Sequence, residues 1–416
     1  MTKKTFVVCL FAVLTGTIFA QQGDVPRGIP HLDHVFVIMM ENHGYGEILN
    51  NPNATFINQY AQSANLATNY FAVAHPSLTN YLETVGGSNF GVLDDNSPDW
   101  HNSQCMPNLA TKMPNLESNT TNICPIAGSG TDAPTPKEDC SNEVSGPPCD
   151  INIDDKHSFN SSSETLAITI ADQLATDGRT WKTYQEDLPQ TGPDGVNYSD
   201  GNFSNLTDFT KFNPPNPVFT NGEIVQLYAS KHDPFVYFQN VQQGSNPLVS
   251  YAQIAGFDGL GGLWGDLGSG HVANLSYIVP NQCNDQHGRS NGTPFCGFDP
   301  VDDGSQAGLN PAGIQLGDQA VQKIVTAIHG SPAWRRGRNA IVVIWDENDY
   351  SQSPITNQVM AIVDTNYGER GAKSGHFYTH FSLLRSIESG FRLPCLNHAC
   401  DDGVQVMSDL FGGGDN

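Results

Sequence analysis

The stretch HVFVIMMEN at residues 34–42 constrains the fold more than any other part of the chain. Val35–Met40 is an unbroken apolar run, which is typical of a strand buried on both faces of a parallel sheet. Glu41, Asn42 and Gly44 follow at once and do not continue the strand. Because open α/β sheets bind ligands just outside the carboxyl ends of their strands, Glu41 and Asn42 lie where a functional site is expected. An ordinary polar turn is the simpler interpretation of these residues alone.

A second stretch with the same pattern lies near the other end of the chain. Residues 340–349, AIVVIWDEND, read as another buried strand, and it ends on Asp346 and Glu347. The recurrence of acidic residues directly after a buried strand favours a functional site over two unrelated turns, because the ends of such strands can meet at one edge of a sheet.

The remaining segments predict strands that alternate with helices. This alternation indicates an α/β fold, with a mostly parallel central sheet covered by helices on both faces. Strands are predicted at 67–71, 180–186, 234–240, 274–281 and 358–364, and helices at 53–64, 79–85, 166–174, 318–328 and 379–389. Thr79 is the predicted N-cap of its helix, which places Ser77 on the turn before it. The glycine-rich residues 256–270 lack the GxGxxG spacing of a nucleotide site and are predicted to form a loop.

Residues 88–163 differ in composition from the segments around them. They are rich in Ser, Asn, Pro, Gly and Asp, have few apolar runs, and contain four of the nine cysteines. We interpret them as a loop-rich insertion pinned by disulfides. Residues 21–416 then form one domain around this insertion.

Residues 1–20 have the features of a secretory signal peptide. Lys3 and Lys4 precede an apolar core, Phe6–Leu14, and Thr17–Ala20 form the region before an expected cleavage site at Gln21. The protein is therefore expected to be secreted, to the periplasm or outside the cell, where disulfides form. The spacing suggests Cys283–Cys296 and Cys395–Cys400 pairs, with the other four mature cysteines pairing among themselves. Sequons for N-glycosylation, expected on surface loops, occur at Asn53, Asn119, Asn160, Asn197, Asn202, Asn205, Asn274 and Asn291.

The overall charge restricts the partners of the protein. With 19 basic and 43 acidic residues, the formal net charge is −24. Such a surface repels nucleic acid and anionic lipid headgroups at long range, so no nucleic-acid partner is expected. No segment after the signal has the roughly 18 apolar residues of a membrane span. The sequence does not indicate an oligomeric state.

Polar residues follow the predicted strands at four places that the topology can bring together. These are Glu41 with Asn42, Ser77 with Asn80, Asn281 through Asp285 to His287, and Asp346 with Glu347. Their carboxylate and amide oxygens suit one divalent ion, Ca²⁺, Mg²⁺ or Mn²⁺. A serine beside such an ion can act as a nucleophile, and a nearby amide can stabilise the charge that develops. A helix cap, a polar turn and a surface histidine are the alternative explanations of the individual residues.

Five motifs, in order, link the chain to a known family. They are MMENHGYGEIL, AHPSLTNYLETVGG, IVPNQCNDQH, VVIWDEND and YTHFSLLRSIE, and they run from about residue 34 to about residue 390. In these motifs the chain resembles the phosphoesterase family of secreted acid phosphatases and of bacterial and plant phospholipases C. That family is similar in fold to alkaline phosphatases, sulfatases and nucleotide pyrophosphatases.

The resemblance implies roles for the residues in the motifs. Glu41 with Asn42, and Asp346 with Glu347, match two pairs of metal ligands. Ser77 matches a nucleophile that also binds the metal and becomes phosphorylated.

Further roles follow from the same resemblance. Asn80 matches an amide that contacts the phosphate. Asp285 and His287 match a motif lining the pocket, where His287 protonates the leaving group or holds the phosphate. His75 and His380 lie in matching motifs and are further candidates. The sequence lacks an obvious second set of His and Asp ligands, which favours one metal ion over the two zinc ions of alkaline phosphatases.

The sequence thus predicts a metal-dependent acid phosphatase that hydrolyses a small phosphomonoester through a phosphoserine. A phospholipase C acting on phosphodiesters is the nearest alternative, because the same residues serve both reactions. A sulfatase is disfavoured because the Cys-x-Pro-x-Arg motif is absent. An alternative of another class is a non-catalytic secreted protein that binds a glycan or a metal.

Overall fold

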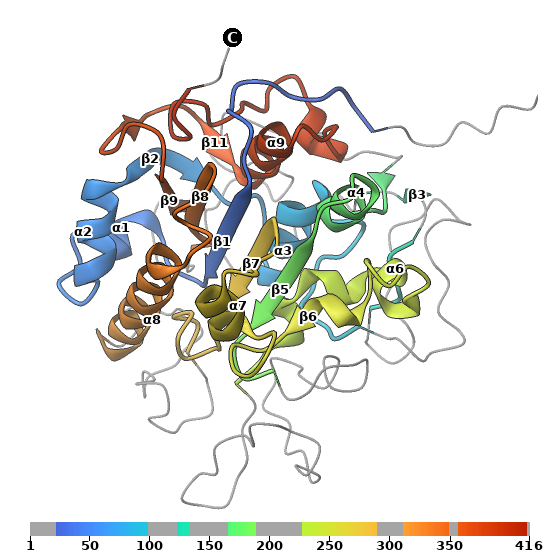
Figure 1. The fold of residues 1–416 in the computed structure, drawn as a ribbon, viewed down its shortest axis with the longest axis horizontal. Coiled ribbons are helices and arrows are strands. Elements are labelled where there is room, and N and C mark those ends of the chain that lie inside the picture. Colours follow the sequence, from blue (N-terminus) through green and yellow to red (C-terminus); the bar gives the residue numbers. More distant parts are fainter. Residues whose placement is uncertain are drawn as a thin grey trace, which may run out of the picture.

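The computed structural model describes residues 22–98, 123–127, 129–130, 132, 165–188, 227–288, 311–348 and 357–413. Within these residues, a nine-stranded sheet forms the centre of the molecule (Figure 1). Its strands are β1 (His34–Met40), β2 (Asn65–Phe71), β5 (Trp181–Gln185), β6 (Ile254–Ala255), β7 (Leu275–Val279), β8 (Asn339–Trp345), β9 (Gln358–Thr365), β10 (Lys373–Ser374) and β11 (Tyr378–Thr379). A separate antiparallel pair consists of β3 (Ser129–Gly130) and β4 (Thr165–Leu166).

The sheet is mostly parallel, as predicted. Its strand order is β10-β2-β9-β8-β1-β7-β5-β6, and β11 also pairs with β2. β1 lies at the centre and runs parallel to both of its neighbours, β7 and β8. β9 is the exception, because it runs antiparallel to β8 and to β2.

Helices cover both faces of the sheet, which confirms the predicted fold class. They are α1 (Tyr45–Ile48), α2 (Thr55–Ser63), α3 (Ser77–Gly86), α4 (Ile170–Thr176), α6 (Gln239–Gln243), α7 (Leu263–Ser269), α8 (Pro311–Gly330) and α9 (His380–Phe391). Short 3₁₀ helices are η2 (Ser230–His232), η3 (Pro234–Tyr237), η4 (Tyr251–Gln253) and η6 (Asn397–Cys400). α3 contacts α4 and α9 on one face, and α8 contacts α2 and α7 on the other (Figure 1).

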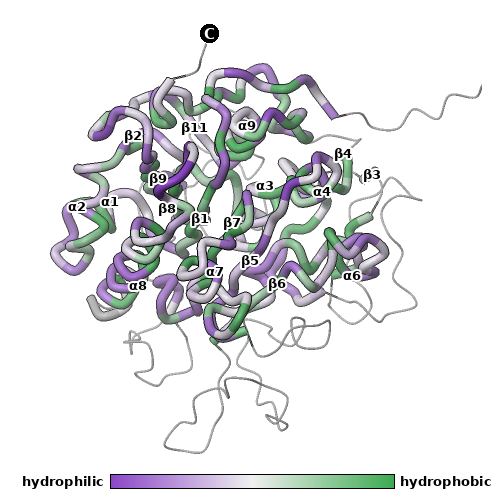
Figure 2. Tube along the Cα trace, in the orientation of Figure 1, coloured by the Kyte–Doolittle hydropathy of each residue, from purple (hydrophilic) through white to green (hydrophobic). Residues whose placement is uncertain are grey.

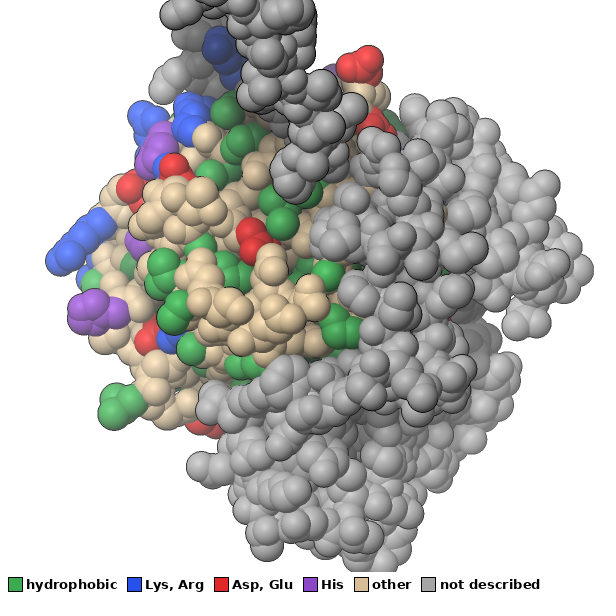
Figure 3. All heavy atoms as spheres, turned by 90° about the vertical axis from the view of Figure 1, so that its right-hand side faces the viewer, with side chains coloured by type: hydrophobic (Ala, Val, Ile, Leu, Met, Phe, Trp, Pro, Cys, Tyr) green, Lys and Arg blue, Asp and Glu red, His purple; other side chains and the backbone are tan. Residues whose placement is uncertain are grey.

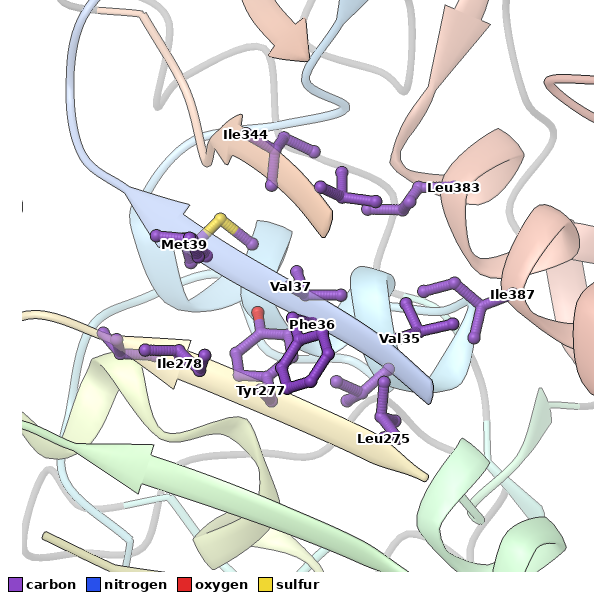
Figure 4. Packing of buried hydrophobic residues seen from close by; sticks show 14 of the residues in the cluster. Val35, Phe36, Val37, Met39, Leu275, Tyr277, Ile278, Ile344, Leu383 and Ile387 are labelled. Carbon is purple, nitrogen blue, oxygen red and sulfur yellow. The ribbon is translucent and has the colours of Figure 1, made fainter. Parts of the chain in front are cut away.

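The central strand β1 is buried on both faces, as its apolar run predicts. Every residue of Val35–Met40 is at most 1% exposed. Leu383 and Ile387 of α9 point toward this strand and its neighbours in the close view of the core (Figure 4). Burial of each such side chain contributes about 2 kcal/mol, so this strand fixes the position of the residues that follow it.

α8 shows how an amphipathic pattern directs a helix onto the sheet. Val321, Ile324, Val325 and Ile328 are buried, whereas Lys323 between them is exposed. The colouring in Figure 2 shows this mixture of hydrophobic and hydrophilic residues along the helix. The helix was predicted at 318–328 and extends further in both directions.

Two predictions of secondary structure are wrong. Residues 234–240 form η3 and the start of α6 in place of a strand. Pro234 has a backbone angle suited to the first turn of a helix, and all of Phe235–Phe238 is buried, so the apolar run does not distinguish strand from helix. Residues 263–269, predicted as loop, form α7, whose buried Leu263, Asp266 and Leu267 have helical spacing.

The starts of two helices also differ from their predicted positions. α3 begins at Ser77 after the extended residue Pro76, and Thr79 is not the cap, because its hydroxyl donates to the carbonyl of Val92 at 3.2 Å. The helix predicted from residue 166 begins at Ile170, with Thr169 as its N-cap. Residue 166 belongs to β4.

The described residues test only part of the disulfide predictions. Cys395 and Cys400 are joined, with their Cα atoms 5.2 Å apart. Cys124 and Cys283 each take part in a disulfide as well. Cys296, the predicted partner of Cys283, lies outside the described residues, as do the signal peptide and most of the predicted insertion at 88–163.

The described surface is not uniformly acidic. On the described part of the face shown in Figure 3, Lys, Arg and His side chains gather at the left margin, with a few Asp or Glu side chains among them. Among the helices that the structure describes, none combines the length and the apolar character needed to cross a membrane.

Candidate functional site

The ends of three neighbouring strands bring the predicted acidic residues together. β1 and β8 are paired in register up to Met40 and Trp345, so Glu41 and Asp346 leave the sheet at the same level. The backbone N–H of Asn42 donates to Asp346 Oδ1 at 3.0 Å. On the other side of β1, the N–H of Glu41 donates to the carbonyl of Asp285 at 2.8 Å. Glu41, Asp285, Asp346 and Glu347 are here called the carboxylate cluster.

Ser77 lies against this cluster. It is the first residue of α3, and its side chain is 1% exposed. Its Oγ lies 3.1 Å from Glu41 Oε2 and 3.3 Å from Glu347 Oε1. The start of the helix thus holds the hydroxyl between carboxylates that come from two different strands.

Asn80 lies one helical turn after Ser77 and connects the helix to the segment before it. Its Oδ1 accepts hydrogen bonds from the N–H groups of Val73 and Ala74, both at 3.0 Å. Its Nδ2 donates to Glu347 Oε2 at 3.0 Å and to the carbonyl of Ala74 at 2.8 Å. In this structure, the amide therefore positions both Glu347 and the approach to Ser77.

The candidate histidines occupy different places around the cluster. His75 Nδ1 lies 3.0 Å from Glu347 Oε2, and its Nε2 lies 3.1 Å from Asn348 Oδ1. His380 contacts the backbone carbonyl of Asp346 through Nε2 at 2.6 Å, and its Nδ1 meets Tyr70 at 3.0 Å. Burial lowers the pKa of His380 to about 4, so this ring is neutral at physiological pH and supports the backbone of Asp346.

His287 and Asp285 lie on the side of the cluster next to β7. The N–H of His287 donates to Asp285 Oδ1 at 2.7 Å, and its Nδ1 lies 2.9 Å from the carbonyl of Gly288. Asn42, His75 and His287 are only half-buried, so the site meets solvent on their side.

The sequence analysis missed two residues of the site, Lys231 and His232. His232 lies between Glu41 Oε1, at 3.1 Å, and Asp285 Oδ2, at 3.3 Å. Its ring stacks on Tyr81 at 5.3 Å. Lys231 and His232 belong to η2 and do not follow a strand, so the pattern of polar residues after strands does not include them. The Lys-His pair before Asp233-Pro234 was the available signal.

Lys231 links the cluster to a further carboxylate. Its Nζ lies 2.8 Å from Asp95 Oδ2 and 3.3 Å from His287 Nε2. Burial alone would lower the pKa of Lys231, but the charges of Asp95 and Glu41 raise it above the ordinary lysine value, so this buried residue carries a positive charge. Asp95 Oδ1 also accepts a hydrogen bond from the N–H of Leu78 at 3.0 Å, in the first turn of α3.

The electrostatics of the cluster favour a cation. Burial and then the charge of Asp346 raise the pKa of Glu41. Burial and the charge of Glu347 raise the pKa of Asp346 to about 8. Among the described residues, Asp346 Oδ2 is buried without a hydrogen bond, and Glu41 Oε1 and Asp285 Oδ2 are buried with only the His232 ring nitrogens beside them, in a geometry that forms no hydrogen bond. Because buried carboxylates that repel one another need a compensating charge, these residues fit a bound divalent ion.

A second set of ligand atoms overlaps the predicted one. Oxygen or nitrogen atoms of Glu41, His232 and His287 lie within 4.8 Å of one another and could hold a metal ion. The predicted set was Glu41, Asn42, Ser77, Asp346 and Glu347. Glu41 is common to both sets.

A serine hydroxyl between carboxylates, at the carboxyl edge of an α/β sheet, suits attack on an ester whose negative charge is neutralised by nearby cations. These features suit an ester hydrolase. The comparison with known proteins is more specific: the model of the phosphoesterase family matches residues 46–294, and the chain belongs to this family. It is a hydrolase that acts on phosphoric ester bonds.

Relatives of known name are distant in sequence. A phosphatidylinositol-3-phosphatase of Mycobacterium tuberculosis is 22% identical over 423 residues, covering 99% of this chain and 96% of that protein. An acid phosphatase of Aspergillus fumigatus is 21% identical over 375 residues, covering 89% of this chain. The match spans 57% of the Aspergillus protein, little more than half of its length.

Similar solved structures include two bacterial proteins. One is a protein of the alkaline phosphatase superfamily from Vibrio parahaemolyticus, with a TM-score of 0.41, 11% identity, and coverage of 92% of this chain and 72% of that one. The other is a lipoteichoic acid synthase from Listeria monocytogenes, with a TM-score of 0.40, 9% identity, and coverage of 92% and 77%.

Proposed function

We propose that this protein is a metal-dependent acid phosphatase that hydrolyses phosphomonoesters through a phosphoserine on Ser77. The observation that carries the proposal is the position of Ser77 Oγ, buried within 3.3 Å of carboxylates that follow β1 and β8. The names of the relatives support a phosphomonoester as the substrate, because both a phosphatidylinositol-3-phosphatase and an acid phosphatase remove a terminal phosphate.

Glu41, Asp285, Asp346 and Glu347 would hold the divalent ion together with Ser77. When bound, such an ion supplies positive charge against the phosphate oxygens and compensates the repulsion among the carboxylates. Ca²⁺, Mg²⁺ and Mn²⁺ all suit oxygen ligands of this kind.

Ser77 Oγ attacks the phosphorus atom. The Oγ–P bond forms as the bond from phosphorus to the alcohol oxygen breaks. Ser77 donates its hydroxyl hydrogen toward Glu41 Oε2 at 3.1 Å, so a carboxylate is in place to take the proton. The position of Ser77 at the start of the ten-residue helix α3 also directs the positive end of the helix dipole at the phosphate.

Lys231 and His287 serve the phosphate and the leaving alcohol. Lys231 supplies the positive charge on this side of the site, and its Nζ lies 3.3 Å from His287 Nε2. His287, half-buried at the solvent side, gives a proton to the departing alcohol. Water then attacks the phosphorus atom and the bond from phosphorus to Ser77 Oγ breaks. Glu41 returns its proton to Ser77 Oγ, His287 takes a proton from the attacking water, and inorganic phosphate is released. Phosphoryl transfer needs mainly positioning and charge neutralisation, which these groups provide.

Activity assays with chromogenic esters test this proposal. Release of p-nitrophenol from p-nitrophenyl phosphate and from its bis-ester is measured from about pH 4 to 9, with and without chelator. Wild type is compared with Ser77→Ala and with Ser63→Ala, a matched control in α2 whose hydroxyl donates only to the carbonyl of Tyr60.

The proposal predicts fast cleavage of the monoester at acidic pH that requires metal, is lost in Ser77→Ala and is unchanged in Ser63→Ala. Preference for the bis-ester would instead support a phospholipase C-type enzyme. No turnover of either ester with divalent ions supplied would support a non-catalytic binding protein.

We also propose that residues 1–20 direct export, so that the mature protein begins at Gln21 outside the cytoplasm. N-terminal sequencing of the exported protein tests this. A mature protein that retains residues 1–20 would contradict it.

A further inference from the structure

A cavity of about 160 Å³ lies beside the carboxylate cluster but is formed by other residues. Glu186 follows β5, Phe257 follows β6, and Asn284 follows β7. These three strands are parallel to one another and to β1. The cavity therefore opens at the edge of the sheet where the site of Ser77 lies, and where α/β sheets bind ligands.

One wall of the cavity is aromatic and apolar. Phe257 and Trp264 meet edge to face, with ring centroids 5.4 Å apart. Lys323 of α8 lies over the Trp264 ring, with Nζ 4.5 Å from its centroid, so this face of the indole is covered. α7 and α8, which carry Trp264 and Lys323, lie next to each other (Figure 1).

The remaining wall is polar and held in place. Asn284 Nδ2 donates to Glu186 Oε2 at 2.8 Å, and the N–H of Asn281 donates to the same oxygen at 3.0 Å. Gln319 of α8 adds a second side-chain amide. Glu186 and Lys323 have opposite charges, so the lining as a whole does not select a charged ligand.

We propose that this cavity binds a neutral, polyhydroxylated six-membered ring, a sugar or a cyclitol. A cavity of about 150 Å³ holds a ring the size of benzene, so the ring of such a ligand fits this cavity while its hydroxyl groups reach the polar lining. Such a ring has an apolar face of C–H groups, which packs on Trp264, and hydroxyl groups around its edge, which pair with the fixed carboxylate and amides. A purely apolar ring would leave those polar groups without partners and is disfavoured.

The cavity is joined to the site of Ser77 through the chain itself. Asn284 lines the cavity, and the next residue, Asp285, belongs to the carboxylate cluster. Gln286, the residue after Asp285, anchors this part of the chain, because its Oε1 accepts a hydrogen bond from Trp345 Nε1 at 2.8 Å. The cavity is thus placed to hold a ring near the phosphate site, but binding there does not depend on the catalytic role of Ser77.

Calorimetric titration of the full chain with glucose and with myo-inositol tests the proposal, with phenol as an apolar ring of similar size. We expect saturable binding of at least one of the two polyols, weakened about tenfold or more in Trp264→Ala, which corresponds to a loss of about 1.4 kcal/mol. Trp334→Ala is the matched control, because Trp334 is also half-buried but packs against His329.

Further variants keep the test decisive. Gln319→Leu changes an exposed helical residue and is expected to weaken polyol binding without unfolding the chain, in case Trp264→Ala fails to fold. Ser77→Ala should bind the polyol as wild type does, so failure of the proposed reaction and failure of this proposal are separable. Binding of phenol but of neither polyol, no saturable binding of any ring, or polyol binding unchanged in both cavity variants would overturn the proposal.

Discussion

His398 provides a prediction whose size follows directly from the structure. The residue lies in the loop closed by the Cys395–Cys400 disulfide and is 4% exposed. Its Nε2 lies 2.7 Å from Asp132 Oδ2, and its Nδ1 lies 2.7 Å from Asp401 Oδ2. Burial alone would lower the pKa of His398, but the hydrogen bonds and charges of these two carboxylates raise it to about 10.

This shift has a definite consequence for stability. The pKa rises from the ordinary value of 6.5 in the unfolded chain to about 10 in the folded one. The folded state therefore holds the proton more tightly, and the stabilisation is fully present below pH 6.5 and is lost as the pH rises to about 10. At about 1.36 kcal/mol per pH unit, the whole effect amounts to about 5 kcal/mol.

Unfolding by urea, without reductant, measures this effect in wild type and in His398→Gln from pH 6 to 10. We expect wild type to exceed the variant by several kcal/mol at pH 6, and the difference to shrink by about 1.4 kcal/mol per pH unit above pH 7. His376→Gln, at an exposed histidine 4.0 Å from Asp409, is the matched control and should follow wild type. A difference between wild type and His398→Gln that stays constant with pH would refute the reasoning.

Three further predictions concern the helix that carries Ser77, the cationic side of the site, and the bound ion. Gly87→Ala should lower the free energy of unfolding by more than about 2 kcal/mol, because Gly87 has φ +71° and a Cβ there would lie 2.5 Å from the carbonyl of Leu396. Gly178→Ala, at φ +75° with open space around it, should lower the free energy of unfolding only by the cost of the backbone conformation. Equal losses of stability for the two variants in a denaturant titration would contradict this account. Lys231→Met should raise KM for a phosphomonoester about tenfold or more, because a charge-assisted contact of about 1.5–3 kcal/mol is lost. The control Lys373→Met, at an exposed lysine, should leave KM unchanged. An unchanged KM in Lys231→Met would remove Lys231 from the phosphate site. Chelation should abolish turnover and also lower the melting temperature, because the carboxylates then repel one another without a compensating charge. A chelated protein of unchanged stability and activity would rule out a cation at the carboxylate cluster.

The sheet and the carboxylate cluster were predictable from the sequence for one physical reason. Strands buried on both faces carry unbroken apolar runs, and the end of each run marks the point where polar residues leave the sheet. Residues 34–40 and 340–345 showed this pattern, and the structure pairs them in register. The sequence alone therefore predicts that Glu41 and Asp346 lie at the ends of buried strands.

The other half of the site depends on contacts that no local pattern encodes. Lys231 and His232 lie on a 3₁₀ turn between irregular segments, and only the tertiary fold brings His232 between Glu41 and Asp285. Likewise, the start of α3 at Ser77 could not be predicted from cap preferences. The N–H of Leu78, in the first turn of α3, donates a hydrogen bond to Asp95, and Asp95 comes later in the sequence than the end of this helix.

The central claim is that Ser77 becomes phosphorylated during turnover, and trapping that state tests it most directly. Wild type is mixed with p-nitrophenyl phosphate and a divalent ion, quenched in acid, digested and examined by mass spectrometry. We predict one added phosphoryl group on the peptide that contains Ser77, and none in Ser77→Ala, which should also be inactive. Rapid turnover with the phosphoryl group on another residue, or turnover that persists in Ser77→Ala, would contradict the claim.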